Sequence, residues 1–149
     1  MADPHSILKK VFGYDSFRPG QEDIVRRLLD GEPLAYVLGE WEFYGLPLRV
    51  TPDVLIPRDD TCAVAELAIR KALFLEQDPR ILDLCCGSGC IGLAIASRVK
   101  DAKVTLADLS MEALAIAKEN TDLLEKVNKA LSELTADGTL QSIVDKYIK

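Results

Sequence analysis

The sequence predicts an α/β fold: one domain with a small sheet containing a parallel β-α-β unit, plus a β-hairpin, packed by five or six helices. Three observations predict this fold. An apolar run enters a turn at Gly87-Ser88-Gly89, which a helical pattern and a second apolar run follow. Aromatic residues alternate around Gly45-Leu46-Pro47, as they do in a hairpin. Most other segments carry apolar residues at helical spacing.

The composition limits the number of domains and the kinds of partner. The chain has 149 residues, of which 48% are hydrophobic, enough for one sizeable core. Its 18 Lys and Arg residues against 24 Asp and Glu residues give a net charge of −6, which disfavours nucleic-acid binding. No apolar run approaches the roughly 20 residues of a membrane span, and the N-terminus lacks the apolar segment of a signal peptide. We therefore expect a cytoplasmic monomer with no nucleic-acid or membrane partner.

The first part of the chain predicts short elements separated by glycine and proline. Ile24, Val25 and Leu28 share one face of a helix that Gly31 ends. The elements expected here are helices at 6–11 and 21–30, a short helix or turn at 32–38, the hairpin at 41–50, and an extended run at 54–56.

The second part predicts the parallel unit and two longer helices. One helix begins at Asp60 or Thr61 and continues to about Leu75. The two strands expected after this helix are near-continuous apolar runs, which predicts that helices cover both faces of the sheet. Ser110 caps a helix of about 25 residues, and Asp137-Gly138-Thr139 ends it. The other expected elements are strands at 80–85 and 104–107, the helix between them at 90–99, and a last helix at 140–147.

Five residues around the glycine turn are candidates for binding a nucleoside: Asp83, Gly87, Ser88, Gly89 and Asp108. A strand, a glycine turn and a later acid are what a protein needs to hold an adenosine cofactor. The glycines let the backbone approach the ligand, and Asp108 accepts the ribose hydroxyls. The alternatives are an ordinary tight turn, a polar strand residue at Asp83, and a solvated acid at Asp108.

The four cysteines, Cys62, Cys85, Cys86 and Cys90, resemble a metal or redox set only at first sight. Cys85 and Cys86 are neighbours whose side chains start on opposite faces of a strand. The chain has no Cys-x-x-Cys, and its single histidine, His5, is distant in sequence. We expect buried or half-buried free thiols in a reducing compartment and no metal site, with zinc as the alternative.

The middle of the chain resembles a known enzyme family. Five motifs occur in order: 32–39 (EPLAYVLG), 42–45 (EFYG), 54–58 (VLIPR), 82–91 (LDLCCGSGCI) and 107–114 (ADLSMEAL). Over about Arg26 to Asn120 the chain resembles the protein-glutamine N5-methyltransferases of the HemK/PrmC type, which methylate peptide-chain release factors with S-adenosylmethionine. The resemblance implies that Asp83 and residues 87–89 face the methionine and ribose, and that Asp108 binds the ribose. The family's Asn-Pro-Pro-Tyr, which holds the acceptor amide, does not occur in this sequence.

The two ends of the chain resemble other families. Residues 11–24 are similar to the adenine-recognition segment of RecQ-type helicases, which implies that Phe17, Arg18 and Gln21 surround a base. The chain lacks the phosphate-binding loop that helicases need, so these residues alternatively serve only in turns and packing. Residues 123–147 are similar to the C-terminal helices of periplasmic amino-acid-binding proteins.

These three resemblances predict an engineered chimera with a non-natural topology. The expected pieces are helicase-like helices at about 1–30, a methyltransferase-like hairpin and β-α-β-α unit at about 26–120, and a helical hairpin at about 121–149. We expect a scaffold that is not an enzyme, with a vestigial cofactor site and either no cofactor or weak binding of S-adenosylmethionine or S-adenosylhomocysteine. The alternatives are a module that retains S-adenosylmethionine, and a truncated release-factor methyltransferase that needs a partner.

Overall fold

The computed structural model describes residues 3–75, 78–139, 141–142 and 145. It confirms the α/β class, with an antiparallel hairpin and a separate parallel pair of strands. The elements in chain order are α1 Pro4–Ile7, the π-helical turn η1 Leu8–Phe12, α2 Gln21–Leu29, α3 Leu34–Leu38, β1 Glu40–Phe43, β2 Leu46–Arg49, α4 Thr61–Leu73, β3 Arg80–Leu84, α5 Cys90–Arg98, β4 Lys103–Ala107 and α6 Met111–Ala136.

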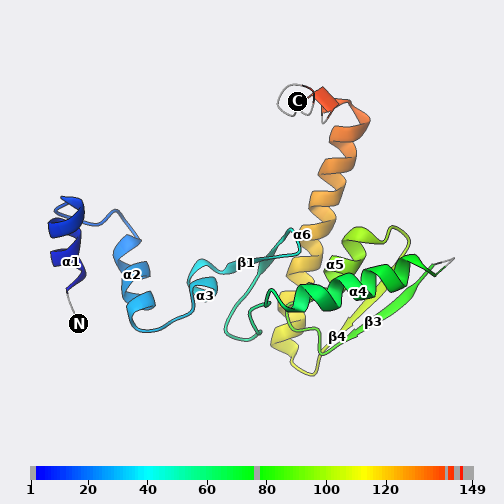
Figure 1. Cartoon of the computed structure of the whole chain (residues 1–149), viewed down its shortest axis with the longest axis horizontal. Coiled ribbons are helices and arrows are strands. Elements are labelled where there is room, and N and C mark those ends of the chain that lie inside the picture. Colours follow the sequence, from blue (N-terminus) through cyan, green and yellow to red (C-terminus); the bar gives the residue numbers. More distant parts are fainter. Residues whose placement is uncertain (1–2, 76–77, 140, 143–144, 146–149) are drawn as a thin grey trace.

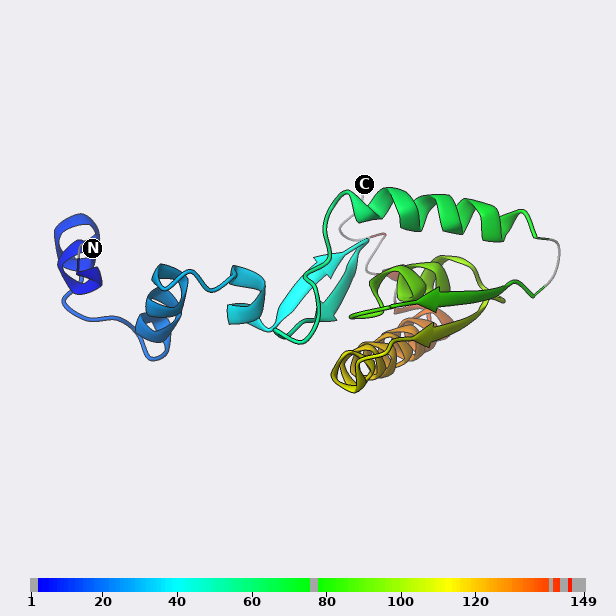
Figure 2. The ribbon, with the colours of Figure 1, turned by 90° about the horizontal axis from the view of Figure 1, so that it is seen from below.

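Residues 3–33, which we call the N-terminal arm, lie to one side of the rest of the molecule (Figures 1 and 2). Asp3 begins the arm by accepting a hydrogen bond from the Ser6 amide at 3.1 Å, which caps α1. None of the residues in α1, η1 or α2 is buried. The arm therefore adds little to the core and does not cover the sheet.

The hairpin turn differs by one residue from the prediction. Tyr44 and Gly45 occupy the turn, with φ of 55° and 80°, and β2 already begins at Leu46. Two consecutive positive φ angles are typical of a type I′ turn, whose twist matches the strands on either side. The segment 54–56 belongs to neither sheet.

The parallel unit is covered on one face only, whereas the sequence predicted cover on both. Helix α5 lies against the sheet, and α4 and α6 flank it on the same side (Figure 2). Ile81 and Val104 point toward this layer and pack in a cluster with Ile95. On the other face Leu82 and Leu84 remain 61% and 70% exposed, because no described segment packs there. The apolar strands predicted that both faces would be covered, but their pattern does not specify which distant segments pack on the second face.

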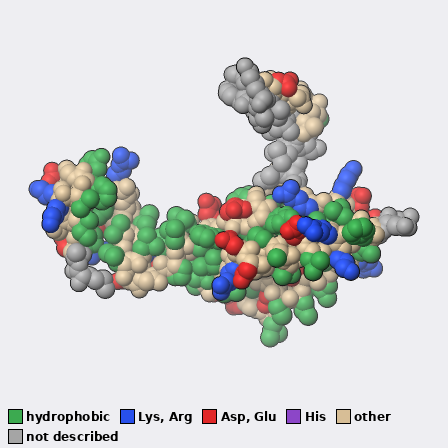
Figure 3. Space-filling model, in the orientation of Figure 1, with side chains coloured by type: hydrophobic (Ala, Val, Ile, Leu, Met, Phe, Trp, Pro, Cys, Tyr) green, Lys and Arg blue, Asp and Glu red, His purple; other side chains and the backbone are tan. Residues whose placement is uncertain are grey.

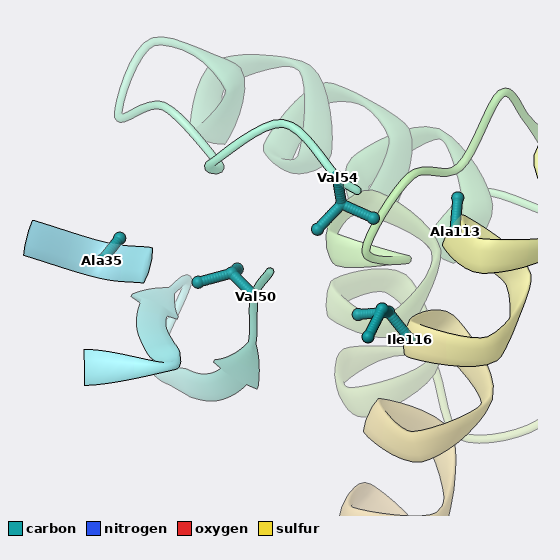
Figure 4. Close-up of a cluster of buried hydrophobic side chains, with 5 residues drawn as sticks. All are labelled: Ala35, Val50, Val54, Ala113 and Ile116. Carbon is teal, nitrogen blue, oxygen red and sulfur yellow. The ribbon is translucent and has the colours of Figure 1, made fainter. Parts of the chain in front are cut away.

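A small apolar cluster joins the hairpin to α6 (Figure 4). Ala35 of α3 lies beside Val50 at the end of the hairpin, and the side chain of Val54 approaches the start of α6. The Tyr36 hydroxyl donates to the Val54 carbonyl at 2.8 Å and fixes the loop after the hairpin. The cluster consists of Ala35, Val50, Val54, Ala113 and Ile116.

Helix α6 begins as the sequence predicted. The Ser110 hydroxyl accepts from the Ala113 amide at 3.0 Å and donates to the Glu112 carboxylate at 3.0 Å. The helix is 26 residues long, and its later part extends away from the sheet (Figure 1). The last predicted helix, 140–147, falls mostly outside the described residues. Within the described ranges no helix is long and apolar enough to cross a membrane.

Candidate functional site

The predicted site residues gather where β3 and β4 end. Both strands run in the same direction, with Leu84 opposite Ala107, so their carboxyl ends share one edge of the sheet. Asp83 is the second-last residue of β3, and Asp108 follows β4 directly. Helix α5 begins at Cys90, immediately after the glycine turn, and directs the positive end of its dipole to this edge. Ligands of open parallel sheets bind at such an edge.

Backbone hydrogen bonds fix the turn between β3 and α5. The Cys86 amide donates to the Ala107 carbonyl at 3.0 Å, and the Gly89 amide donates to the Cys86 carbonyl at 2.8 Å. Gly87 has φ of 55°, and a Cβ there would meet no atom within 4 Å. Its surface is thus open, so that a ligand can approach the backbone closely. Gly89 is different, because a Cβ there would lie 3.1 Å from Leu106.

Asp108 holds the turn in place. One carboxylate oxygen accepts from the Gly87 amide at 2.9 Å, and the other accepts from the Ser110 amide at 3.0 Å. These two backbone hydrogen bonds, that from Gly87 first, lower the pKa of Asp108. Each oxygen of an ionised carboxylate has a second lone pair, so the side chain can also accept from a ligand hydroxyl.

Asp83 of β3 is half-buried, and its side chain contacts the first turn of α5. Its carboxylate accepts from the Gly92 amide at 2.8 Å. Burial raises the pKa of Asp83, the bond from Gly92 lowers it, and the nearby charge of Asp108 raises it further, with burial the largest effect. The two acids of this edge thus have pKa values displaced in opposite directions.

Gly92 is a close-packing residue to which sequence reasoning assigned no role. A Cβ at this position would lie 2.3 Å from Leu106 and 3.0 Å from the Asp83 carboxylate. The absence of a side chain lets α5 approach β4 and lets the Gly92 amide reach Asp83. The available signal was a glycine inside a helical pattern, which usually has a packing reason.

Asn120 was also missed. It is 2% exposed and its side chain donates to the Ser88 carbonyl in the glycine turn at 2.9 Å. It lies on the apolar stripe of α6 with Ala113, Ile116 and Ala117. A polar residue in such a stripe was the signal, because a buried amide needs partners from other segments.

Of the three cysteines near the glycine turn, Cys85 is exposed, which corrects the expectation that the thiols are all buried or half-buried. Cys86 is buried and Cys90 is half-buried, and burial raises the pKa of both thiols. They are therefore protonated and weakly nucleophilic at neutral pH. Across the part of the chain that the structure describes, no group of three or more histidine, cysteine or acidic residues could hold a metal ion.

The helicase-like residues lie in the arm, away from the glycine turn. Phe17, Arg18 and Gln21 line a pocket of about 600 Å³ with apolar neighbours such as Phe12. The Gln21 side chain accepts from the Arg18 amide at 2.9 Å, so it stabilises the start of α2. This arrangement fits the alternative of turn and packing residues.

The model of the methyltransferase small domain matches residues 66–147, more than half of the chain. A release factor glutamine methyltransferase of Vibrio cholerae is 48% identical over 128 residues, covering 83% of this chain and 44% of that protein. A protein of the same name from Fusobacterium nucleatum is 43% identical, covering 76% of this chain and 32% of that protein. This chain spans less than half the length of these curated relatives.

These findings correct the prediction of a designed scaffold that is not an enzyme. Natural bacterial proteins named as methyltransferases are 43–48% identical to it, so the chain comes from an enzyme family. The alignment with the Vibrio cholerae protein is longer than the segment from Arg26 to Asn120. The family model also includes residues that the sequence assigned to a periplasmic protein.

No comparison supports the helicase-like or periplasmic pieces, or an engineered origin. The expectation that no cofactor is used is likewise not supported, since membership of a methyltransferase family implies the use of S-adenosylmethionine. The predicted boundaries near residues 30 and 120 stay a prediction. Residues 66–147 contain both parallel strands, the glycine turn and Asp108, and the chain accordingly belongs to the methyltransferase small domain family.

Proposed function

We propose that this chain is the cofactor-binding part of a release factor glutamine methyltransferase. The observation that carries the proposal is the meeting of Asp83, the open Gly87 turn and Asp108 at one edge of the parallel sheet. The names of the relatives support the same assignment. The ligand is S-adenosylmethionine, which supplies an activated methyl group when it is bound.

The proposed roles follow from charge and space. Asp108 stays ionised, since its pKa is lowered, and accepts the ribose hydroxyls with the lone pairs that Gly87 and Ser110 leave. The bare backbone at Gly87 lets the ligand lie against the turn. The α5 N-terminus attracts the amino-acid carboxylate, and Asp83 attracts the neighbouring ammonium group.

The proposed methyl acceptor is a glutamine of a release factor. Polypeptide other than these 149 residues is proposed to position this glutamine. The sequence has no Asn-Pro-Pro-Tyr, and the match covers only 44% of the Vibrio cholerae relative. The exposed face at Leu82 and Leu84 supports this proposal, because apolar faces of that kind are normally covered by further structure. The truncated methyltransferase that needs a partner is thus favoured over the scaffold.

The test is calorimetric titration with S-adenosylhomocysteine. We expect the chain to bind with a dissociation constant on the order of 100 μM, because the turn and Asp108 are present while the chain matches only 44% of its Vibrio cholerae relative. Asp108→Ala should weaken binding at least tenfold, since it removes the acceptor for the ribose. Asp101→Ala is the matched control, because Asp101 lies at the opposite end of β4. Absence of binding by the wild-type chain at about 1 mM ligand would contradict the proposal.

A further inference from the structure

Asn120 is a buried polar side chain that joins three segments far apart in sequence. It projects from α6 and lies among apolar residues, yet only 2% of it is exposed. An amide in such surroundings is costly unless its donors and acceptor all have partners. The hydrogen-bond partners of Asn120 therefore indicate its role.

The side-chain amide of Asn120 uses both donors and its acceptor. Its oxygen accepts from the Arg49 amide at 2.7 Å, and its nitrogen donates to the Arg49 carbonyl at 3.1 Å. The same nitrogen donates to the Ser88 carbonyl at 2.9 Å. Two carbonyl partners require a donor, which fixes the orientation of the amide. One side chain thus binds the edge of the hairpin and the glycine turn together.

The peptide unit between Ser88 and Gly89 is held at both ends. Its carbonyl accepts from Asn120, and its amide donates to the Cys86 carbonyl at 2.8 Å. Gly89 has φ of 80° and immediately precedes α5. The orientation of this one peptide sets the path of the turn between Gly87 and the first residue of the helix.

We propose that Asn120 is a positioning residue that fixes the glycine turn in its ligand-binding shape and couples it to the hairpin. This inference rests on the proposed function, because it assigns the turn to S-adenosylmethionine. Asn120 acts through the Ser88 carbonyl and does not itself contact the ligand. A shift of the hairpin at Arg49 is transmitted to the turn through a single planar amide.

A second link between α6 and the hairpin provides the matched control. The Arg49 side chain pairs with Glu119 at 2.9 Å, and both groups are about half exposed. Glu119→Gln removes this ion pair without touching Ser88. Thr121→Val is a further control on the same helix, since the Thr121 hydroxyl donates only to the Ala117 carbonyl at 2.8 Å.

The experiment measures S-adenosylhomocysteine affinity, melting temperature and amide exchange in the variant Asn120→Asp and in the two controls. The aspartate keeps the acceptor for Arg49 but loses both donors and faces two carbonyl oxygens. We expect at least a tenfold loss of affinity and at least tenfold faster exchange of the Gly89 amide, with a cooperative melt. Both controls should bind within twofold of the wild type. Wild-type affinity in Asn120→Asp, or an equal loss in Glu119→Gln, would overturn the proposal.

Two further measurements keep the inference separate from the proposed function. If Asn120→Asp does not fold, the role of Asn120 is tested instead by nuclear magnetic resonance of the wild-type chain during a titration with S-adenosylhomocysteine. The side-chain amide of Asn120 should then shift with the same midpoint as Gly87 and Gly89 during the titration, and a static Asn120 resonance would overturn the proposal. If the wild type binds no ligand, the proposed function fails. The Gly89 exchange rate in ligand-free Asn120→Asp, or in the uncharged Asn120→Ser, then decides the role of Asn120 by itself.

Discussion

Asp83 and Asp108 lie near the carboxyl ends of neighbouring strands, and the fold shifts their pKa values in opposite directions. The pKa of Asp108 is lowered by amide donors, so the stability that it contributes is present above its unfolded pKa and is lost as the pH falls. The pKa of Asp83 is raised by burial, so its contribution is complete below its unfolded pKa and is lost as the pH rises through its folded pKa. At neutral pH one acid stabilises the fold and the other destabilises it.

We predict that Asp83→Asn raises the stability at neutral pH. The asparagine oxygen can still accept from the Gly92 amide, and no charge has to be buried. The melting temperature at pH 7 should rise by about 2 °C or more, and the variant and wild type should converge near pH 4 or below. Thermal melts across this pH range check the prediction. A lower melting temperature at pH 7 would show that the charge of Asp83 favours the fold.

Gly92→Ala should destabilise the protein by about 1–3 kcal/mol, because its Cβ would overlap Leu106 in the layer between α5 and β4. The sign is decisive here. Helix propensity alone predicts that alanine stabilises by about 1 kcal/mol. Denaturant unfolding measures the difference, and a gain in stability would mean that α5 can move away from β4 without cost.

At the residue scale, the sequence predicts groups whose role is local and misses those whose role depends on distant segments. Gly87 and Asp108 belong to two neighbouring local motifs, 82–91 and 107–114, and the Gly87 amide meets the Asp108 carboxylate at 2.9 Å. Asn120 binds Arg49, which lies 71 positions away. Periodicity indicates that Asn120 lies on a buried stripe, but it does not indicate which backbone groups lie opposite.

The sequence predicts the bounds of the helices and strands closely, but it predicts the contacts between them less well. The predicted helix at 90–99 is observed as Cys90–Arg98, because its apolar face and its glycine start are local signals. The hairpin turn shifted to Tyr44-Gly45, since a type I′ turn needs two residues with positive φ. The helical cover expected on both faces of the sheet was wrong, because the apolar pattern of the strands does not indicate which distant segments pack there.

We predict that deleting residues 1–31 leaves the rest of the molecule folded. The arm contains no buried residue in α1, η1 or α2, and it extends away from the body (Figures 1 and 2). The melting temperature of the shortened chain should stay within about 2 °C of the wild type. Differential scanning calorimetry provides the measurement.

A longer deletion through Gly39 is the matched control. It removes Ala35, which is buried beside Val50, and Tyr36, which bonds the Val54 carbonyl. This variant should lose about 2 kcal/mol or more. Equal melting temperatures for the two deletions would show that α3 adds nothing to the core, and a large loss in the shorter deletion would show that the arm packs against the body.

The whole molecule contains part of a methyltransferase fold, and among the described residues one face of its parallel sheet is covered and the other is exposed. Hydrophobic side chains are visible over the arm and on the body (Figure 3). Three resemblances in one chain led to the prediction of an engineered chimera, because short helical segments match many families. The natural relatives and the extent of the family model correct that prediction. The motifs identified the family of the central segment, but short helical matches at the two ends could not show whether those ends belong to the same family.

The most direct measurement is a titration of isotope-labelled protein with S-adenosylhomocysteine, followed residue by residue in amide nuclear magnetic resonance spectra. We predict saturable shifts at Gly87, Gly89 and Asp108, with little change in the arm at Phe17 and Gln21. Asp108→Ala should abolish the shifts at the glycine turn. Saturable shifts confined to the arm pocket, or no shift at the turn at ligand concentrations of about 1 mM, would contradict the assignment of this edge of the sheet to S-adenosylmethionine.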